Sequence, residues 1–149
     1  MTFFQNEIEY ISMFLTFEKY STKNHSKFLL KYHIIFVVKY RKKLLIKPLS
    51  DDMKKILTNI SNKYDFEIDL MEVDNDHIHL LVSSVPSVSP TQIVNRLKQM
   101  STIEIWKLYG MFLQRHFWNE KTFWTDGYFV STIGDVSEKT IKDYIEKQG

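Results

Sequence analysis

Two histidines are separated by a single residue in a short apolar run, Asp76-His77-Ile78-His79-Leu80-Leu81-Val82. The aliphatic and β-branched residues of this run follow a polar turn, which predicts a buried strand. Because side chains alternate across a strand, His77 and His79 emerge on one face and Ile78 on the other. Two neutral imidazoles on a rigid element can bind a metal ion and leave coordination positions for a substrate. Ordinary strand histidines share this spacing, so the pair alone leaves both interpretations open.

A tyrosine and a glutamine near the C-terminus form a second candidate pair. The last helix is predicted from about Glu138 to Gln148, where Tyr144 and Gln148 are four residues apart and share a face. A phenol can act as a covalent nucleophile, and an amide oxygen can bind a metal. Both residue types are also usual on helix surfaces, so the pair by itself does not identify a site. His33 is expected to be a packed core or edge histidine rather than a ligand.

The elements that must position these residues are predicted in the order β-α-β-β-α-β-α. Strands are predicted over 28–38, 66–73, 77–82 and 127–133, and helices over 51–63, from Pro90 to Gly110, and over 138–148. Ser50 is expected to cap the first helix, and Ser89-Pro90-Thr91-Gln92 predicts a capping box. This order is typical of an α+β, ferredoxin-like (RRM-like) split βαβ fold. Such a fold has an antiparallel sheet with helices on one face, here with an added C-terminal helix.

Length and composition indicate one domain. The chain has 149 residues, enough for a core without disulfides, and it contains no cysteine, which excludes thiolate zinc sites and cysteine nucleophiles. We expect a domain over 27–149 after an N-terminal appendage, 1–26, for which no periodicity predicts a structure. No secretion signal is evident, and the most apolar stretch, 28–38, is too short to span a bilayer. A soluble, cytoplasmic protein is therefore expected.

Charge and aromatic residues bear on a nucleic-acid partner. The net charge is only +2, but residues 27–47 contain lysines and an arginine without any acid, whereas 51–76 are mainly acidic. A basic face suits phosphate contacts, although a solvated surface would show the same pattern. The aromatic residues between 111 and 124 are expected to be core rather than base-stacking platforms. They are Phe112, Phe117, Trp118, Phe123 and Trp124.

Several short motifs occur together in one order from about residue 20 to the C-terminus. They are Lys31-Tyr32-His33, Lys39-Tyr40-Arg41-Lys42, the histidine strand 76–82, Phe123-Trp124, Gly127-Tyr128-Phe129-Val130, Thr132-Ile133-Gly134 and Tyr144-Ile145-Glu146-Lys147-Gln148. In this ordered set the chain resembles the single-tyrosine transposases of the insertion-sequence 200/605 family. These belong to the HUH endonuclease superfamily and have the REP-associated tyrosine transposases as close relatives. The chain departs from the family at 98–102, Lys-Gln-Met-Ser-Thr, where a Lys-Gly-x-Ser-Ser segment is frequent.

The resemblance implies a metal-dependent single-strand DNA endonuclease and strand transferase. Tyr144 would attack the DNA and form a 5′-phosphotyrosine, while His77, His79 and Gln148 would hold Mg²⁺ or Mn²⁺. The two histidines are then expected to face metal and substrate rather than the core. The expected partner is single-stranded DNA with hairpin ends. Its phosphates would be contacted by Lys39, Arg41, Lys42, Lys43, Arg96 and Lys98.

The resemblance also implies a homodimer whose active sites each combine the histidines of one chain with Tyr144 of the other. Gly134, before the last helix, would allow the required turn. Two alternatives remain at this point. One is a host-domesticated nuclease acting on repeated palindromes, and the other is a non-catalytic ferredoxin-like nucleic-acid-binding module.

Overall fold

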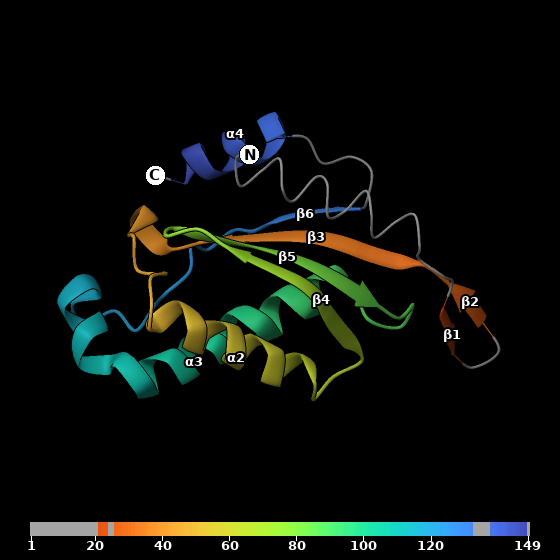
Figure 1. The fold of residues 1–149 in the computed structure, drawn as a ribbon, viewed down its shortest axis with the longest axis horizontal. Helices are drawn as coiled ribbons and strands as arrows, with labels where there is room; N and C mark the ends of the chain where they lie inside the picture. The colour runs from red at the N-terminus through yellow and green to blue at the C-terminus, as the bar shows by residue number, and fades with distance from the viewer. Residues whose placement is uncertain (1–20, 24–25, 133–137, 149) are drawn as a thin grey trace.

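The computed structural model describes residues 21–23, 26–132 and 138–148. Its elements are β1 (Ser21–Lys23), β2 (Ser26–Phe28), β3 (Leu30–Val37), η1 (Lys39–Arg41), α2 (Leu49–Ser61), β4 (Phe66–Val73), β5 (His77–Ser84), α3 (Pro90–Phe117), β6 (Phe129–Thr132) and α4 (Glu138–Lys147). The hinge predicted at Gly134 and most of the predicted appendage lie outside the described residues. Figure 1 shows α2 and α3 on one side of the main sheet and α4 on the other.

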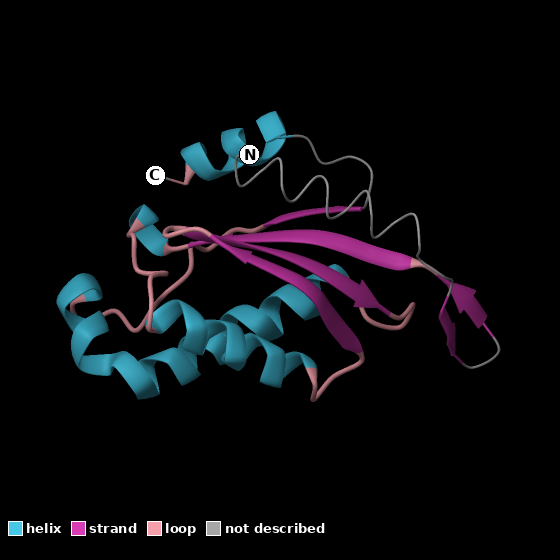
Figure 2. Ribbon diagram, in the orientation of Figure 1, coloured by secondary structure: helices cyan, strands magenta, loops and turns pink. Residues whose placement is uncertain are grey.

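The main sheet has four antiparallel strands in the order β4-β5-β3-β6. α2 connects β3 to β4, and α3 connects β5 to β6, so two split βαβ units interlock. This confirms the predicted ferredoxin-like class. The short β1-β2 hairpin projects from the end of β3 as a separate two-stranded sheet (Figure 2).

The two faces of the sheet are covered by different helices. On β3, Ile34 and Phe36 pack in the large core with residues of α2 and α3, whereas Ile35 and Val37 pack in a second, smaller cluster with Ile141 of α4. Alternation across the strand separates the two sets. β3 is thus buried on both faces along most of its length, as its continuous apolar run predicts.

Local signals located some element ends correctly. β4 covers the predicted residues 66–73. The capping box is present, since Ser89 Oγ accepts from the Gln92 backbone N–H at 3.2 Å and the Ser89 N–H donates to Gln92 Oε1 at 2.9 Å. The histidine strand continues to Ser84, two residues beyond the prediction.

Other predicted ends are wrong. α2 begins at Leu49, and its N-cap is Pro48 without a side-chain hydrogen bond, so Ser50 lies inside the helix instead of capping it. β3 begins at Leu30 rather than at 28, and β6 begins at Phe129 rather than at 127. No helix among the described residues is long and apolar enough to cross a membrane.

α3 does not end at Gly110 but continues to Phe117. A glycine inside a helix costs about 1 kcal/mol relative to alanine, which burial of nearby apolar side chains can offset. Leu113 and Phe117, beyond the glycine, are both buried in the large core. The helix bends at Tyr109, where φ is −125° and ψ is 24°. Tertiary packing therefore outweighs the local stop signal.

Candidate active site

His77 and His79 lie on the face of the sheet that α4 covers. His77 pairs with Val37 and His79 with Ile35 in the antiparallel register, and paired residues share a face. Val37 and Ile35 pack with α4. The predicted common face of the two histidines is therefore present. His77 and His79 are each only 4% exposed. The expectation that they face metal and substrate rather than the core is therefore wrong in this arrangement, in which α4 covers them.

A carboxylate and a guanidinium continue outward from His77. The Asp76 carboxylate lies against this imidazole, with Oδ1 2.7 Å from His77 Nδ1. Its other oxygen, Oδ2, accepts from Arg41 Nε at 3.4 Å. Arg41 reaches this position from η1 with a left-handed φ of 52°. Asp76 thus fixes one ring nitrogen of His77 and directs the other away from the carboxylate.

His79 contacts a third imidazole, His33 of β3. The atoms His33 Nδ1 and His79 Nε2 are 2.7 Å apart, and the ring centroids are 4.9 Å apart. Burial lowers the pKa of His79 to about 4, with His77 lowering it further and Glu72 opposing the change. Burial, followed by the proximity of His79, lowers the pKa of His33 to about 3. Both rings are therefore neutral near pH 7, and one donates a hydrogen bond to the other.

Tyr144 rests on the same face, on β6 and the segment that precedes it. Its ring lies 5.7 Å from the Phe129 ring, centroid to centroid. Its hydroxyl oxygen is 3.8 Å from the position that a Cβ on Gly127 would occupy. A Cβ at residue 127 would therefore lie at ordinary van der Waals distance from the hydroxyl. The segment around Gly127 is thus near the Tyr144 hydroxyl.

The Tyr144 hydroxyl is enclosed and has no hydrogen-bond partner among the residues that the structure describes. Burial raises the pKa of this phenol. The Thr125 hydroxyl lies near enough to oppose the rise in part, although the two oxygens do not meet hydrogen-bond geometry. A buried polar group without a partner is costly, and such groups cluster at functional positions. In this arrangement the phenol is protonated and not activated.

The tyrosine helix is held by a small apolar cluster. Ile141 and Ile145 of α4 pack on Ile35 and Val37 of β3. Gln148 follows the last residue of the helix, and its backbone N–H donates to the Ile145 carbonyl at 3.1 Å. Its side chain is half-buried. The predicted catalytic tyrosine and both predicted histidine ligands thus share one face, with Gln148 at the end of the helix that covers it.

The residues of this face are suitable for a divalent metal ion. A ligating histidine commonly gives its other ring nitrogen to a carboxylate, as His77 does to Asp76. Metal ligation requires neutral imidazoles, which the low pKa of His79 satisfies. No group of three or more His, Cys, Asp and Glu side chains suited to a metal occurs in the described ranges. Gln148, the third ligand expected from the sequence, would offer an amide oxygen, a donor type outside that group.

Most of the predicted DNA-contacting residues have partners within the chain. Lys39 pairs with Glu120, which raises the lysine's pKa, and Arg41 contacts Asp76. The Arg96 guanidinium lies 4.0 Å from the centroid of the Tyr64 ring. Lys42 is half-buried, and Lys43 is exposed.

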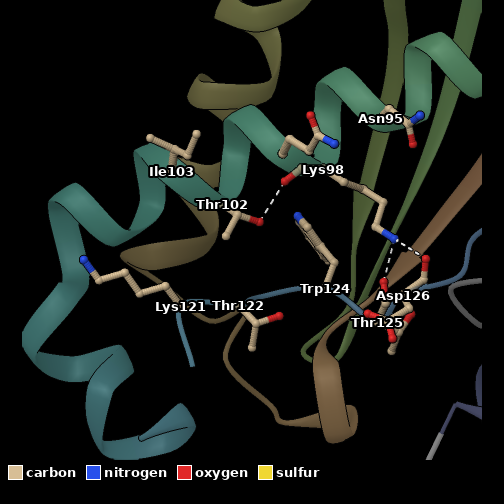
Figure 3. A pocket seen from close by; sticks show the side chains of 10 residues that line it. Asn95, Lys98, Thr102, Ile103, Lys121, Thr122, Trp124, Thr125 and Asp126 are labelled. Atoms are coloured by element: carbon tan, nitrogen blue, oxygen red, sulfur yellow. Dashed lines mark hydrogen bonds between the residues drawn. The ribbon is translucent and has the colours of Figure 1, made fainter. Parts of the chain in front are cut away.

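Lys98 has the most extensive set of contacts. Its ammonium donates to the carbonyl oxygens of Thr125 and Asp126 at 2.6 and 2.9 Å (Figure 3), and to that of Gly127 at 3.0 Å. Burial lowers the pKa of this lysine, and Asp126 partly opposes the change. Lys98 thus connects α3 by hydrogen bonds to residues 125–127, the segment near the Tyr144 hydroxyl.

Sequence reasoning assigned His33 to the core and Asp76 to a turn, and it gave no role to Thr125. His33 and Ile35 are two residues apart and so share a face, but only the pairing of β3 with β5 brings His33 to His79. A signal for Asp76 was available, since a carboxylate beside a candidate ligand histidine is a usual orienting partner.

The sequence is similar to those of known transposases. Residues 26–148 match the family model described as "Transposase IS200 like". The chain is 34% identical over 119 residues to the ISDra2 transposase TnpA of Deinococcus radiodurans, covering 80% of this chain and 84% of that protein. It is 30% identical over 124 residues to the transposase for insertion sequence element IS200 of Salmonella typhimurium, covering 83% and 80%.

Two solved structures have the same fold. A crystal structure described as that of a putative transposase from Deinococcus radiodurans R1 superposes with a TM-score of 0.79 at 29% identity, covering 86% of this chain and 97% of that one. A REP-associated tyrosine transposase bound to a REP hairpin superposes with a TM-score of 0.52 at 11% identity, covering 84% and 69%. At that identity the second similarity concerns the fold alone.

Proposed function

Because the chain belongs to the IS200-like transposase family, we propose that it cleaves and rejoins single-stranded DNA at the hairpin-marked ends of a mobile element. The observation that carries this proposal is the placement of Tyr144 and the pair His77 and His79 on one face of the sheet. A nucleophile and a candidate metal site on one rigid surface are the parts that phosphoryl transfer to a tyrosine requires. We expect this reaction to take place in the cytoplasm.

In the proposed reaction the Tyr144 oxygen attacks the scissile phosphorus. The tyrosine loses its proton, a bond forms between its oxygen and phosphorus, and the bond from phosphorus to the 3′ oxygen breaks. The products are a 5′-phosphotyrosine and a strand whose 3′ oxygen has taken up a proton. One ester replaces another, so the step needs no ATP. A 3′-OH that attacks the phosphotyrosine reverses the exchange and joins a new strand.

His77, His79 and Gln148 would hold Mg²⁺ or Mn²⁺, which would act as a Lewis acid on the scissile phosphate. Asp76 would orient His77 through its Nδ1. His33 holds His79 Nε2, so metal binding at that nitrogen would require this contact to open. The Tyr144 hydroxyl is enclosed, with its pKa raised by burial, so α4 would shift before DNA reaches it.

Formation of a covalent adduct tests the proposal. Single-stranded DNA carrying the element's ends should form a denaturation-resistant adduct with the wild-type protein in Mn²⁺. The Tyr144→Phe variant should form none while still binding the hairpin. Chelator, or the double substitution His77→Ala and His79→Ala, should also prevent it. An adduct that persists in Tyr144→Phe and disappears in Tyr128→Phe would assign the nucleophile to the other tyrosine.

We also propose that the active protein is a homodimer that exchanges α4 between chains. In the single chain, α4 covers its own sheet through the cluster of Ile141 and Ile145 (Figure 1). An equivalent sheet on a second copy offers the same apolar surface, so exchange of α4 between chains costs little free energy. Mixing Tyr144→Phe protein with the double histidine variant should restore cleavage if sites are shared. If the two inactive proteins exchange subunits and remain inactive, each site is built within one chain.

A further inference from the structure

A long groove follows the outer side of α3 and the segment after it, away from the histidine face. One hollow of about 560 Å³ lies between α3 and residues 121–126 (Figure 3). A second, of about 760 Å³, lies beside it along the C-terminal half of α3. Thr102, Ile103 and Lys121 line both hollows, so the two are adjacent, and together they are called the groove below.

All three tryptophans of the chain line this groove. Two of them are held in place by hydrogen bonds from their indole N–H groups. Trp124 is buried and donates from Nε1 to Ser101 Oγ at 2.9 Å, and half-buried Trp106 donates from Nε1 to the Thr122 carbonyl at 2.8 Å. Trp118 is different because it is 81% exposed. It is the C-cap of α3 and has a φ of 55°, a backbone conformation that residues other than glycine rarely adopt. Its ring lines the second hollow and is open to solvent.

The ionisable groups that line the groove are mostly cationic. Lys98, Lys107 and Lys121 line it, with Asp126 as the acid among the lining residues. Lys98 is occupied by three backbone carbonyls, and Lys107 makes an exposed 2.9 Å pair with Glu104, the kind of pair that solvent weakens. Cations beside an exposed aromatic ring are the features by which single-stranded nucleic acids are bound without sequence preference.

The groove ends at the seat of the candidate nucleophile. Thr125 and Asp126 line it, and the Thr125 side chain lies near the Tyr144 hydroxyl. We propose that the groove binds the unpaired DNA strand adjoining the cleavage point, with a base stacked on Trp118 and phosphates near Lys107 and Lys121. This inference rests on the proposed cleavage of single-stranded DNA and adds the path of the flanking strand.

Binding of a labelled oligothymidylate of about ten nucleotides, without a hairpin, tests the path. Fluorescence anisotropy is measured in a Tyr144→Phe background, so that no cleavage interferes. Trp118→Ala should weaken binding about tenfold, the value expected for loss of one stacked base, and Trp118→Phe should restore most of it. Lys121→Met should lower the salt dependence by about 0.7 in slope. Leu108→Ala is the matched control, because Leu108 is 61% exposed on α3 and lies outside both hollows.

Circular dichroism and thermal unfolding establish that each variant is folded, and Lys121→Met remains as an independent test if Trp118→Ala is not. Equal affinity in Trp118→Ala and Leu108→Ala, with an unchanged salt slope in Lys121→Met, would overturn the proposal. So would a wild-type dimer that Trp118→Ala converts to monomer without changing oligonucleotide affinity, since the groove would then contact protein. Adduct formation by the otherwise wild-type protein is scored separately. Failure of that reaction with Trp118-dependent binding intact would reject the proposed cleavage but not the groove.

Discussion

The two faces of the main sheet are built on different principles. The face toward α2 and α3 is almost wholly apolar, and strands and helices contribute to one large core that includes Phe36, Leu80 and Leu97. The face toward α4 has a small cluster of Ile35, Val37, Ile141 and Ile145 beside buried His33, His77 and His79. Burying polar groups costs free energy, whereas burying apolar surface gains it. We infer that the first face supplies most of the stability, while the second gives up stability to hold reactive groups.

The largest expected effect comes from truncating the apolar face. Phe36 is 0% exposed and lies 5.5 Å from the Trp124 ring, centroid to centroid. Phe36→Ala should lower the free energy of unfolding by about 3–5 kcal/mol, because it removes buried surface and leaves a cavity. Urea denaturation measures the loss, and Phe112→Ala, at a partly exposed position, serves as the control. A loss below about 1 kcal/mol would contradict the assignment of stability to this face.

The difference between the faces also explains what could be predicted from the sequence. The strand at 66–73 and the capping box at Ser89 were predicted because turns, caps and period-2 patterns are local. The end of α3 was not, because burial of Leu113 and Phe117 depends on packing that no local pattern encodes. The fold class needed only the order of elements and the apolar alternation.

The candidate site was predicted in its parts but not in its connections. His77 and His79 share a face by strand alternation alone, whereas the contact of His33 with His79 requires the register between β3 and β5. Lys98 was predicted as a phosphate contact from its charge. In the structure its ammonium donates to the carbonyls of residues 125–127. These contacts depend on tertiary packing, which the sequence pattern does not show.

The second expected effect concerns Lys98, which connects the two faces. Lys98→Met would leave the carbonyls of Thr125, Asp126 and Gly127 without this donor, so stability should fall by about 1–3 kcal/mol. Adduct formation should slow as well, because Thr125, whose carbonyl Lys98 binds, also has its side chain near the Tyr144 hydroxyl. Hairpin binding should keep its salt dependence. A slope reduced by about 0.7–0.9 would show instead that Lys98 contacts a phosphate.

The third effect is acid destabilisation through the buried histidines. The pKa values of His33 and His79, about 3 and about 4 when folded, lie below 6.5, the value for an unfolded chain. Between these limits the unfolded state binds more protons, so stability falls as the pH drops below 6.5 and is retained above it. One such histidine should cost about 1.5 kcal/mol between pH 6.5 and pH 5.

This acid effect is measured by urea denaturation at several pH values in the presence of chelator. His33→Leu removes one of the two titrating rings, so its stability should depend less on pH over this interval than that of the wild type. His116→Leu, which alters a histidine on α3 outside the buried face, is the control substitution. Parallel curves for the wild type and His33→Leu would mean that His33 is not neutral and buried in solution.

The smallest expected effect on global stability comes from the tyrosine helix. Ile145 is buried, and truncating a buried isoleucine to alanine usually costs 2–5 kcal/mol. α4, however, has only ten residues and is attached through a small cluster, and isolated helices of this length are marginal in water. The helix can therefore detach before the rest of the domain unfolds. The loss of global stability on truncating Ile145 is then limited to the free energy with which α4 docks on the sheet.

We expect Ile145→Ala to lower the global free energy of unfolding by less than about 1 kcal/mol while abolishing amide-exchange protection in α4. Leu97→Ala, the equivalent truncation on the opposite face, should cost several times more and leave local exchange in α4 unchanged at low denaturant. Equal global losses for the two variants would mean that α4 unfolds together with the core, and a helix fixed so firmly could not release the enclosed Tyr144 hydroxyl to reach DNA.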